Sequence, residues 1–188
     1  DQDLYLASGH LSTALDNQYP QSSFAQRNQL FRNDGNRFTE VTNRAGPGLL
    51  QVRSSRGVAA GDYDGDGDED LLVVNRNDLP SLLRNDTNSG SHWLALRTEG
   101  AVSNRDGVGA RVRVVSGNKV QTREVRAGSS YLSHNSLWLT FGLGDRTAAD
   151  SILVRWPSGA THRFAKVEAG RFLHLREDAD ALVELTPR

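Results

Sequence analysis

The stretch Asp62-Tyr63-Asp64-Gly65-Asp66-Gly67-Asp68-Glu69-Asp70 places six carboxylates within nine residues and contains no basic residue. Like charges this close repel one another, so a folded loop of this composition is expected to hold a cation. Gly65 and Gly67 permit the positive-φ turns that wrap a backbone around an ion. Carboxylate oxygens, with no Cys or His among them, favour calcium over zinc or copper. The stretch predicts a calcium loop, and a solvated acidic turn is the alternative.

The spacing begins like an EF-hand, with oxygens at positions 1, 3 and 5 and Gly at position 6. Position 12 is Val73, where an EF-hand needs a bidentate Glu, so that interpretation fails. Strand-like segments at 57–60 and 71–74 flank the loop, which predicts a strand-loop-strand site. The predicted ligands are the side chains of Asp62, Asp64, Asp66 and Asp70 and the backbone carbonyl of Asp68.

The chain has 188 residues, of which 37% are apolar and 24% charged, as expected for a globular protein with its own core. The absence of cysteine excludes disulfides and thiolate metal sites. No apolar run approaches the ~20 residues of a membrane span, so no membrane insertion is expected. The chain has no Met and begins at Asp1, which we interpret as a processed product or a fragment of a longer protein.

The charges are divided unequally along the chain. Residues 1–90 carry thirteen Asp and Glu against eight Arg, and residues 91–188 carry ten against fourteen Lys and Arg. The basic charges are scattered singly, which favours a solvated surface over an anion-binding patch. Nucleic acid is not an expected partner, because no recognised reading motif accompanies the charge.

Residues 1–90 contain an internal repeat. Asp1–Leu6 matches Asp68–Val73, and Leu30–Asp34 matches Leu82–Asp86, in the same order. On this match, Asp1 and Asp3 are positions 7 and 9 of an earlier acidic loop. Residues 10–28 are expected to form an extended surface loop, and a tight turn at 33–36 predicts a hairpin between 30–32 and 37–41.

The stretch from Gly57 to Leu71, followed by Leu82–Asp86, resembles the calcium-binding repeats of the FG-GAP and VCBS type. Such repeats build β-propellers in integrin α-chains and in many secreted bacterial proteins. The resemblance implies calcium ligands at loop positions 1, 3, 5, 7 and 9, which are the five aspartates assigned above. It also implies propeller-type blades of four short strands, although one and a half copies cannot close a propeller.

From about residue 91 the composition changes to strand-length segments with partial alternation. They cover residues 92–97, 109–115, 120–125, 137–141, 152–156, 161–165 and 172–175. No stretch shows a capped helical period, so we expect an antiparallel sandwich or an open barrel. Its predicted core aromatic residues are Trp93, Trp138, Phe141, Trp156 and Phe164.

This second half resembles the ASPIC and UnbV C-terminal domain, which follows such repeats in proteins like cartilage acidic protein and its bacterial relatives. The similarity rests on residues 92–94, 103–112, 123–125, 128–133, 141–145 and 154–159. It implies a secreted or surface protein. Combining both resemblances, we predict an all-β chain with a repeat region at 1–90, containing partial propeller blades, and a sandwich-like domain at 91–188.

No catalytic residues are predicted. His92, His134, His162 and His174 share no metal-ligand spacing, and the chain lacks a nucleophile elbow and a His-Glu-x-x-His motif. Asn104, Arg105 and Asp106 form a polar cluster that we interpret as a shaped loop, with a ligand-binding loop as the alternative. Arg123 and Arg126 are interpreted as surface residues, with a glycan or carboxylate as the alternative ligand. Asn85-Asp86-Thr87 is a glycosylation sequon.

Together these features predict a calcium-stabilised binding or structural module, active in adhesion or surface interaction and without catalysis of its own. Its location is expected to be extracellular, at the cell surface or in the periplasm, and its partner a protein or glycan surface. One alternative is an assembly subunit whose incomplete first repeat is completed by a neighbouring chain through the N-terminal strand. Another is a fragment of a calcium-dependent propeller enzyme.

Overall fold

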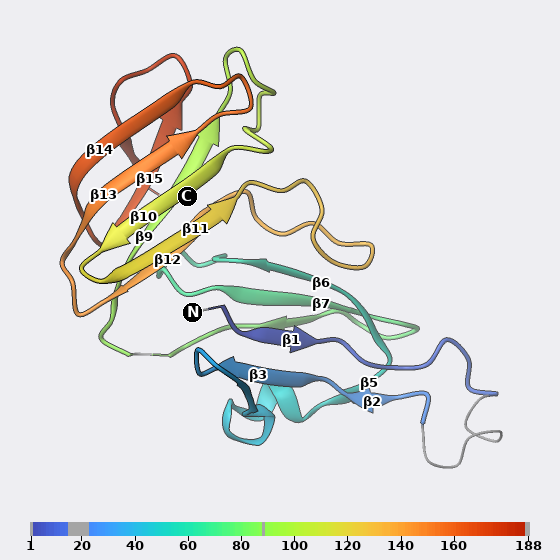
Figure 1. The fold of residues 1–188 in the computed structure, drawn as a ribbon. Helices are drawn as coiled ribbons and strands as arrows, with labels where there is room; N and C mark the ends of the chain where they lie inside the picture. The colour runs from blue at the N-terminus through green and yellow to red at the C-terminus, as the bar shows by residue number, and fades with distance from the viewer. Residues whose placement is uncertain (1, 15–22, 88, 187–188) are drawn as a thin grey trace. The chain divides into compact units, whose positions relative to one another are not determined.

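The computed structural model describes residues 2–14, 23–87 and 89–186 (Figure 1). In these residues the regular structure is β, apart from two short 3-10 helices, and no sheet closes into a barrel. This confirms the predicted all-β class. None of the described helices has the length and apolarity needed to cross a bilayer.

The chain divides into two compact units. The first contains residues 1–60, 70–85 and 128–135, and the second contains residues 61–69, 86–127 and 136–188. The predicted boundary between residues 90 and 91 stays a prediction.

The first unit contains three small sheets, with strand orders β1-β3-β4, β2-β5 and β6-β7-β8. Its elements are β1 (Leu4–Leu6), β2 (Gln26–Arg27), β3 (Gln29–Asn33), β4 (Phe38–Glu40), η1 (Thr42–Arg44), η2 (Pro47–Leu50), β5 (Val52–Arg53), β6 (Ser55–Gly61), β7 (Asp70–Asn75) and β8 (Ser81–Leu83). The predicted hairpin is present as β3 and β4, and Gly35 takes a φ of +87° in its turn. Of the predicted surface loop at 10–28, residues 15–22 lie outside the described residues.

The two copies of the repeat share one strand register. Leu4 pairs with Phe31 and Leu6 with Gln29 between β1 and β3. The equivalent positions Leu71–Leu83 and Val73–Ser81 pair between β7 and β8. Register decides which side chains share a face, so equal registers place equivalent residues on equivalent faces of their sheets. Their burial differs, because Val73 is 1% exposed and its counterpart Leu6 is 39% exposed.

The second unit contains two four-stranded sheets, with orders β11-β10-β13-β14 and β12-β9-β15-β16 (Figure 1). Its strands are β9 (His92–Glu99), β10 (Arg111–Ser116), β11 (Lys119–Glu124), β12 (Leu139–Gly144), β13 (Ala148–Arg155), β14 (Thr161–Glu168), β15 (Arg171–Arg176) and β16 (Val183–Leu185). Each predicted strand segment overlaps one of β9 to β15. The pairing of β9 with β15 is parallel, which differs from the antiparallel prediction.

One hydrophobic core joins the inner faces of these two sheets, so the unit is a sandwich and not an open barrel. Phe141 and Trp156 lie in this core, and Phe164 packs partly against it, as predicted. Trp93 and Trp138 do not belong to the core cluster, so that part of the prediction is wrong. Both rings instead pack edge-on against Phe172 on β15, with ring centroids 4.8 and 5.3 Å apart.

A buried carboxylate fixes the loop that follows β9. Glu177 is 6% exposed, and its Oε2 accepts the backbone N–H groups of Ala101, Val102 and Ser103. Its Oε1 accepts the hydroxyls of Ser103 and Ser158. Burial alone would raise the pKa of this carboxyl, but the hydrogen bonds from Ser158, Ser103 and Ala101 outweigh burial and lower the pKa to about 2.

Candidate metal centre

The acidic loop runs from the end of β6 to the start of β7 and folds around the side chain of Asp62. Oδ1 of Asp62 accepts the N–H groups of Gly65 (2.7 Å) and Asp66 (3.2 Å). Oδ2 accepts the N–H of Gly67 (2.8 Å). Gly65 and Gly67 have φ values of +77° and +97°, which an L side chain rarely adopts. The two glycines therefore allow the tight winding that the sequence predicts.

The loop and the first residue of β7 bring three carboxylates together. Asp62, Asp64 and Asp70 each offer an oxygen within 4.8 Å of the others. Asp64 is exposed, Asp62 is partly buried, and Asp70 is only 2% exposed. No other group of three or more His, Cys, Asp and Glu in the described ranges has this proximity.

Asp70 is held in place by the strand that follows the loop. The backbone N–H of Asn85 donates to its Oδ1 at 2.7 Å. The first repeat contains the same bond, because the N–H of Asn33 donates to Oδ1 of Asp3 at 2.8 Å. Asp3 and Asp70 are thus structurally equivalent, as the sequence match predicts. Asp1, the other predicted position of the earlier loop, lies outside the described residues.

The electrostatics of the loop favour a cation. Burial raises the pKa of the Asp62 carboxyl, and the Asp66 carboxylate raises it further, against the lowering effect of the N–H groups of Gly67 and Gly65. At an effective dielectric constant of about 20, two like charges 4.8 Å apart repel by roughly 3 kcal/mol. A bound divalent ion would convert this repulsion into attraction.

The donor set fits a hard cation. Calcium takes oxygen ligands at about 2.3–2.6 Å, so two oxygens bound to one ion lie at most about 5 Å apart. The mutual spacing of the Asp62, Asp64 and Asp70 oxygens is within that limit. The absence of nitrogen and sulfur donors disfavours zinc and copper.

The structure leaves two predicted ligands outside this group. Oδ1 of Asp66 accepts the N–H of Asp68 at 2.9 Å, and the Asp66 carboxylate is not one of the three clustered carboxylates. The roles of Asp66 and of the Asp68 carbonyl as ligands stay predictions.

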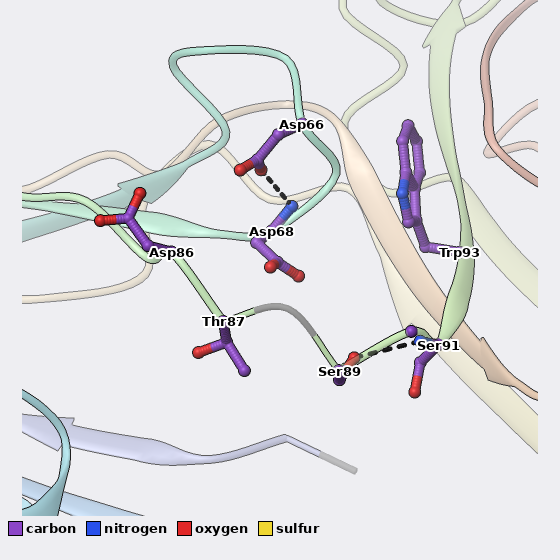
Figure 2. A pocket seen from close by; sticks show the side chains of 8 residues that line it. Asp66, Asp68, Asp86, Thr87, Ser89, Ser91 and Trp93 are labelled. Atoms are coloured by element: carbon purple, nitrogen blue, oxygen red, sulfur yellow. Dashed lines mark hydrogen bonds between the residues drawn. The ribbon is translucent and has the colours of Figure 1, made fainter.

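A polar hollow of about 330 Å³ is lined in part by the loop residues Asp66 and Asp68 (Figure 2). The carboxylates of Asp66, Asp68 and Asp86 line it together with Thr87, Ser91 and the indole of Trp93. The sequence analysis did not associate Trp93 with the acidic loop. No local signal indicates it, because the two segments are separated by β7 and β8.

Gly67 lies directly against Trp93. A Cβ atom added to Gly67 would lie 1.9 Å from Cε2 of the indole, so no larger residue fits without displacing the ring or the loop.

Glu69, in the same loop, forms an ion pair of 3.5 Å with Arg123. Arg123 also lies over the Phe141 ring at 5.5 Å, so its interpretation as a surface arginine is wrong.

Two of the four named histidines, His162 and His174, take structural positions. Nδ1 of His162 accepts the indole N–H of Trp156 at 2.8 Å, and Nε2 of His174 lies 3.2 Å from Glu99.

In the loop after β9, Oδ1 of Asn104 accepts the N–H of Val108 at 2.9 Å, and the side-chain NH2 of Asn104 donates to the carbonyl of Val108. This is the shaped loop that the sequence predicts.

Comparisons with protein families agree with this architecture. The model of an FG-GAP-like repeat matches residues 1–73, which include the acidic loop, and the model named ASPIC and UnbV matches residues 100–182. No curated protein matches the chain. FG-GAP repeats are often calcium-binding, and the two matches indicate a β-rich module of the extracellular type. The chain therefore carries an FG-GAP-like repeat followed by an ASPIC and UnbV domain.

Proposed function

We propose that the chain is a binding module of the extracellular type, acting in adhesion or surface interaction, whose fold is stabilised by calcium in the acidic loop. The observation that carries the calcium proposal is the group of three carboxylate oxygens within 4.8 Å of one another. Asp62, Asp64 and Asp70 would supply the side-chain ligands, and Asp66 and the carbonyl of Asp68 would complete the set.

Calcium's proposed role is architectural. The ion would neutralise the loop and tie the end of β6 to the start of β7. The ordered ligands are absent from the unfolded chain, so binding free energy adds to the stability of the folded state. At a free calcium concentration of about one hundred times Kd, this contribution is about 2.7 kcal/mol.

Calcium removal tests the proposal. We expect excess chelator to lower the melting temperature of the wild-type chain by roughly 5–10 °C relative to saturating calcium. Asp64→Asn should abolish most of this calcium dependence, because it removes the charge of one clustered carboxylate. Differential scanning calorimetry measures the shift, and isothermal titration measures the calcium stoichiometry.

Asp145→Asn is the matched control, since Asp145 is an exposed aspartate in the β12–β13 turn, outside the loop. The control should melt with the calcium dependence of the wild type. A wild-type melt that is the same in chelator and in millimolar calcium would refute the proposal.

A second candidate function is assembly through β1. In the described residues β1 is an edge strand paired with β3, whereas its counterpart β7 lies between β6 and β8. Leu4 and Leu6 on β1 are 42% and 39% exposed. An open edge of this kind accepts a further strand.

Sedimentation velocity at several protein concentrations tests the assembly. We expect a concentration-dependent larger species that Leu6→Lys abolishes, because a charged side chain blocks strand addition at an edge. Val52→Lys, a change of the same type at an exposed position outside β1, should leave the assembly intact. A monomer at all concentrations would contradict this candidate. The enzyme-fragment alternative stays a prediction.

A further inference from the structure

The sheet β11-β10-β13-β14 carries a cluster of arginines on its solvent face. Arg111 and Arg113 on β10 are exposed, and they alternate with Val112 and Val114, which are fully buried. In the same way, Arg155 on β13 and Arg163 on β14 point away from the core. The cluster is therefore formed by three adjacent strands.

The strand register places these four side chains close together. Arg111 lies directly opposite Arg155. Arg113 lies opposite Leu153, which in turn lies opposite Arg163. Adjacent strands are about 4.8 Å apart and alternate residues about 6.7 Å apart along a strand, so the four positions fit within an area roughly 10 Å across.

Little negative charge balances this face. Glu124 pairs with Arg111 at 2.9 Å. In the part of the chain that the structure describes, Arg113, Arg155 and Arg163 form no ion pair. Like charges directly opposite each other destabilise a sheet, and the ion pair with Glu124 offsets only the charge of Arg111. An anionic ligand would relieve this repulsion.

The chemistry of the face indicates the kind of ligand. All four cations are arginines, whose planar forks bind carboxylate and sulfate groups with two parallel hydrogen bonds. They project from a sheet whose opposite face is packed into the core at Val112, Val114, Ile152 and Val154. A cluster of exposed arginines spread over three adjacent strands suits an extended polymer with repeating negative charges.

We propose that this face binds an anionic polysaccharide, a linear sugar polymer that carries carboxylate or sulfate groups. The choice of a polysaccharide rests on the proposal that the chain is a binding module of the extracellular type. It does not rest on the calcium site.

The direct test measures binding of immobilised polygalacturonate and dextran sulfate by biolayer interferometry, with uncharged dextran as the blank. The triple variant Arg113→Gln/Arg155→Gln/Arg163→Gln keeps side-chain length and removes the forks. We expect its Kd to rise by at least about tenfold, because three charge-assisted contacts are lost.

The matched control is Arg97→Gln/Arg146→Gln/Arg176→Gln, which removes the same charge from exposed arginines of the same unit outside this face. Its Kd should change by no more than about twofold, as expected for screened surface charges. Equal losses in the two variants would show that only net charge matters and would overturn the proposal. Circular dichroism establishes that both variants fold.

Two further experiments separate polysaccharide binding from the binding of other anions and from the calcium site. Tighter binding to duplex DNA or to phosphatidylserine vesicles than to both polysaccharides would overturn the assignment, as would the absence of wild-type binding to either polysaccharide. Binding should persist in excess chelator and in Asp64→Asn. Failure of the calcium proposal would thus leave this result unchanged, and the two failures are distinguishable.

Discussion

At the scale of single residues, Glu177 makes the most hydrogen bonds of any carboxylate described above. It accepts three backbone N–H groups and two hydroxyls while almost fully buried. In Glu177→Gln, the side-chain NH2 group replaces one carboxylate oxygen. The buried N–H or O–H groups that donate to that oxygen then face another donor and lose their acceptor. We expect a loss of about 3 kcal/mol in unfolding free energy, measured by urea denaturation at neutral pH. Glu184→Gln, at an exposed position on β16, should cost little.

The pKa of Glu177 gives this residue a pH signature. Its folded-state pKa of about 2 lies below the ordinary value of 4.5, so its stabilisation is complete above pH 4.5. The stabilisation is lost as the pH falls from 4.5 through about 2. The difference in unfolding free energy between wild type and Glu177→Gln should therefore shrink over this interval. A difference that stays constant from pH 5 to pH 2 would contradict the role assigned to the carboxylate.

At the scale of the element, the acidic loop is shaped by Gly67 as well as by its carboxylates. Gly67 and Gly159 have nearly equal φ values of +97° and +95°, but only Gly67 lies against another side chain. Gly159→Ala should cost about 1–2 kcal/mol for the left-handed backbone. Gly67→Ala adds the collision with Trp93 and should cost a further 1–3 kcal/mol or so. Urea denaturation measures the loss of unfolding free energy in both variants. Equal costs would show that the contact with Trp93 is unimportant.

The elements themselves could largely be predicted from the sequence. Hydrophobic alternation located β9 to β15 within a few residues, and the apolar run after the acidic loop located β7. The recurrence of Asp3 with Asn33 and of Asp70 with Asn85 has a physical cause, because each pair is joined by a hydrogen bond. The parallel pairing of β9 with β15 could not be predicted, since alternation specifies a face and not a partner strand.

At the scale of the whole molecule, features built from distant residues could not be predicted from the sequence. The arginines clustered on the solvent face of the sheet β11-β10-β13-β14 are scattered along the chain and become neighbours only through the register of β10, β13 and β14. Glu177 lies more than seventy residues beyond the N–H groups that it accepts. The acidic loop, in contrast, concentrates its carboxylates within nine consecutive residues, so its chemistry could be predicted locally.

Residues 128–135 belong to the first unit, although the chain on both sides of them belongs to the second. Oδ1 of Asn135 accepts the N–H of Ala60, and Ser133 occupies the space beside Gly57. A chain truncated after residue 90 would lack Ser133 and Asn135, so β6 would lose both contacts. The segments of the two compact units alternate along the chain, so a cut between the two family matches would not separate one complete unit from the other.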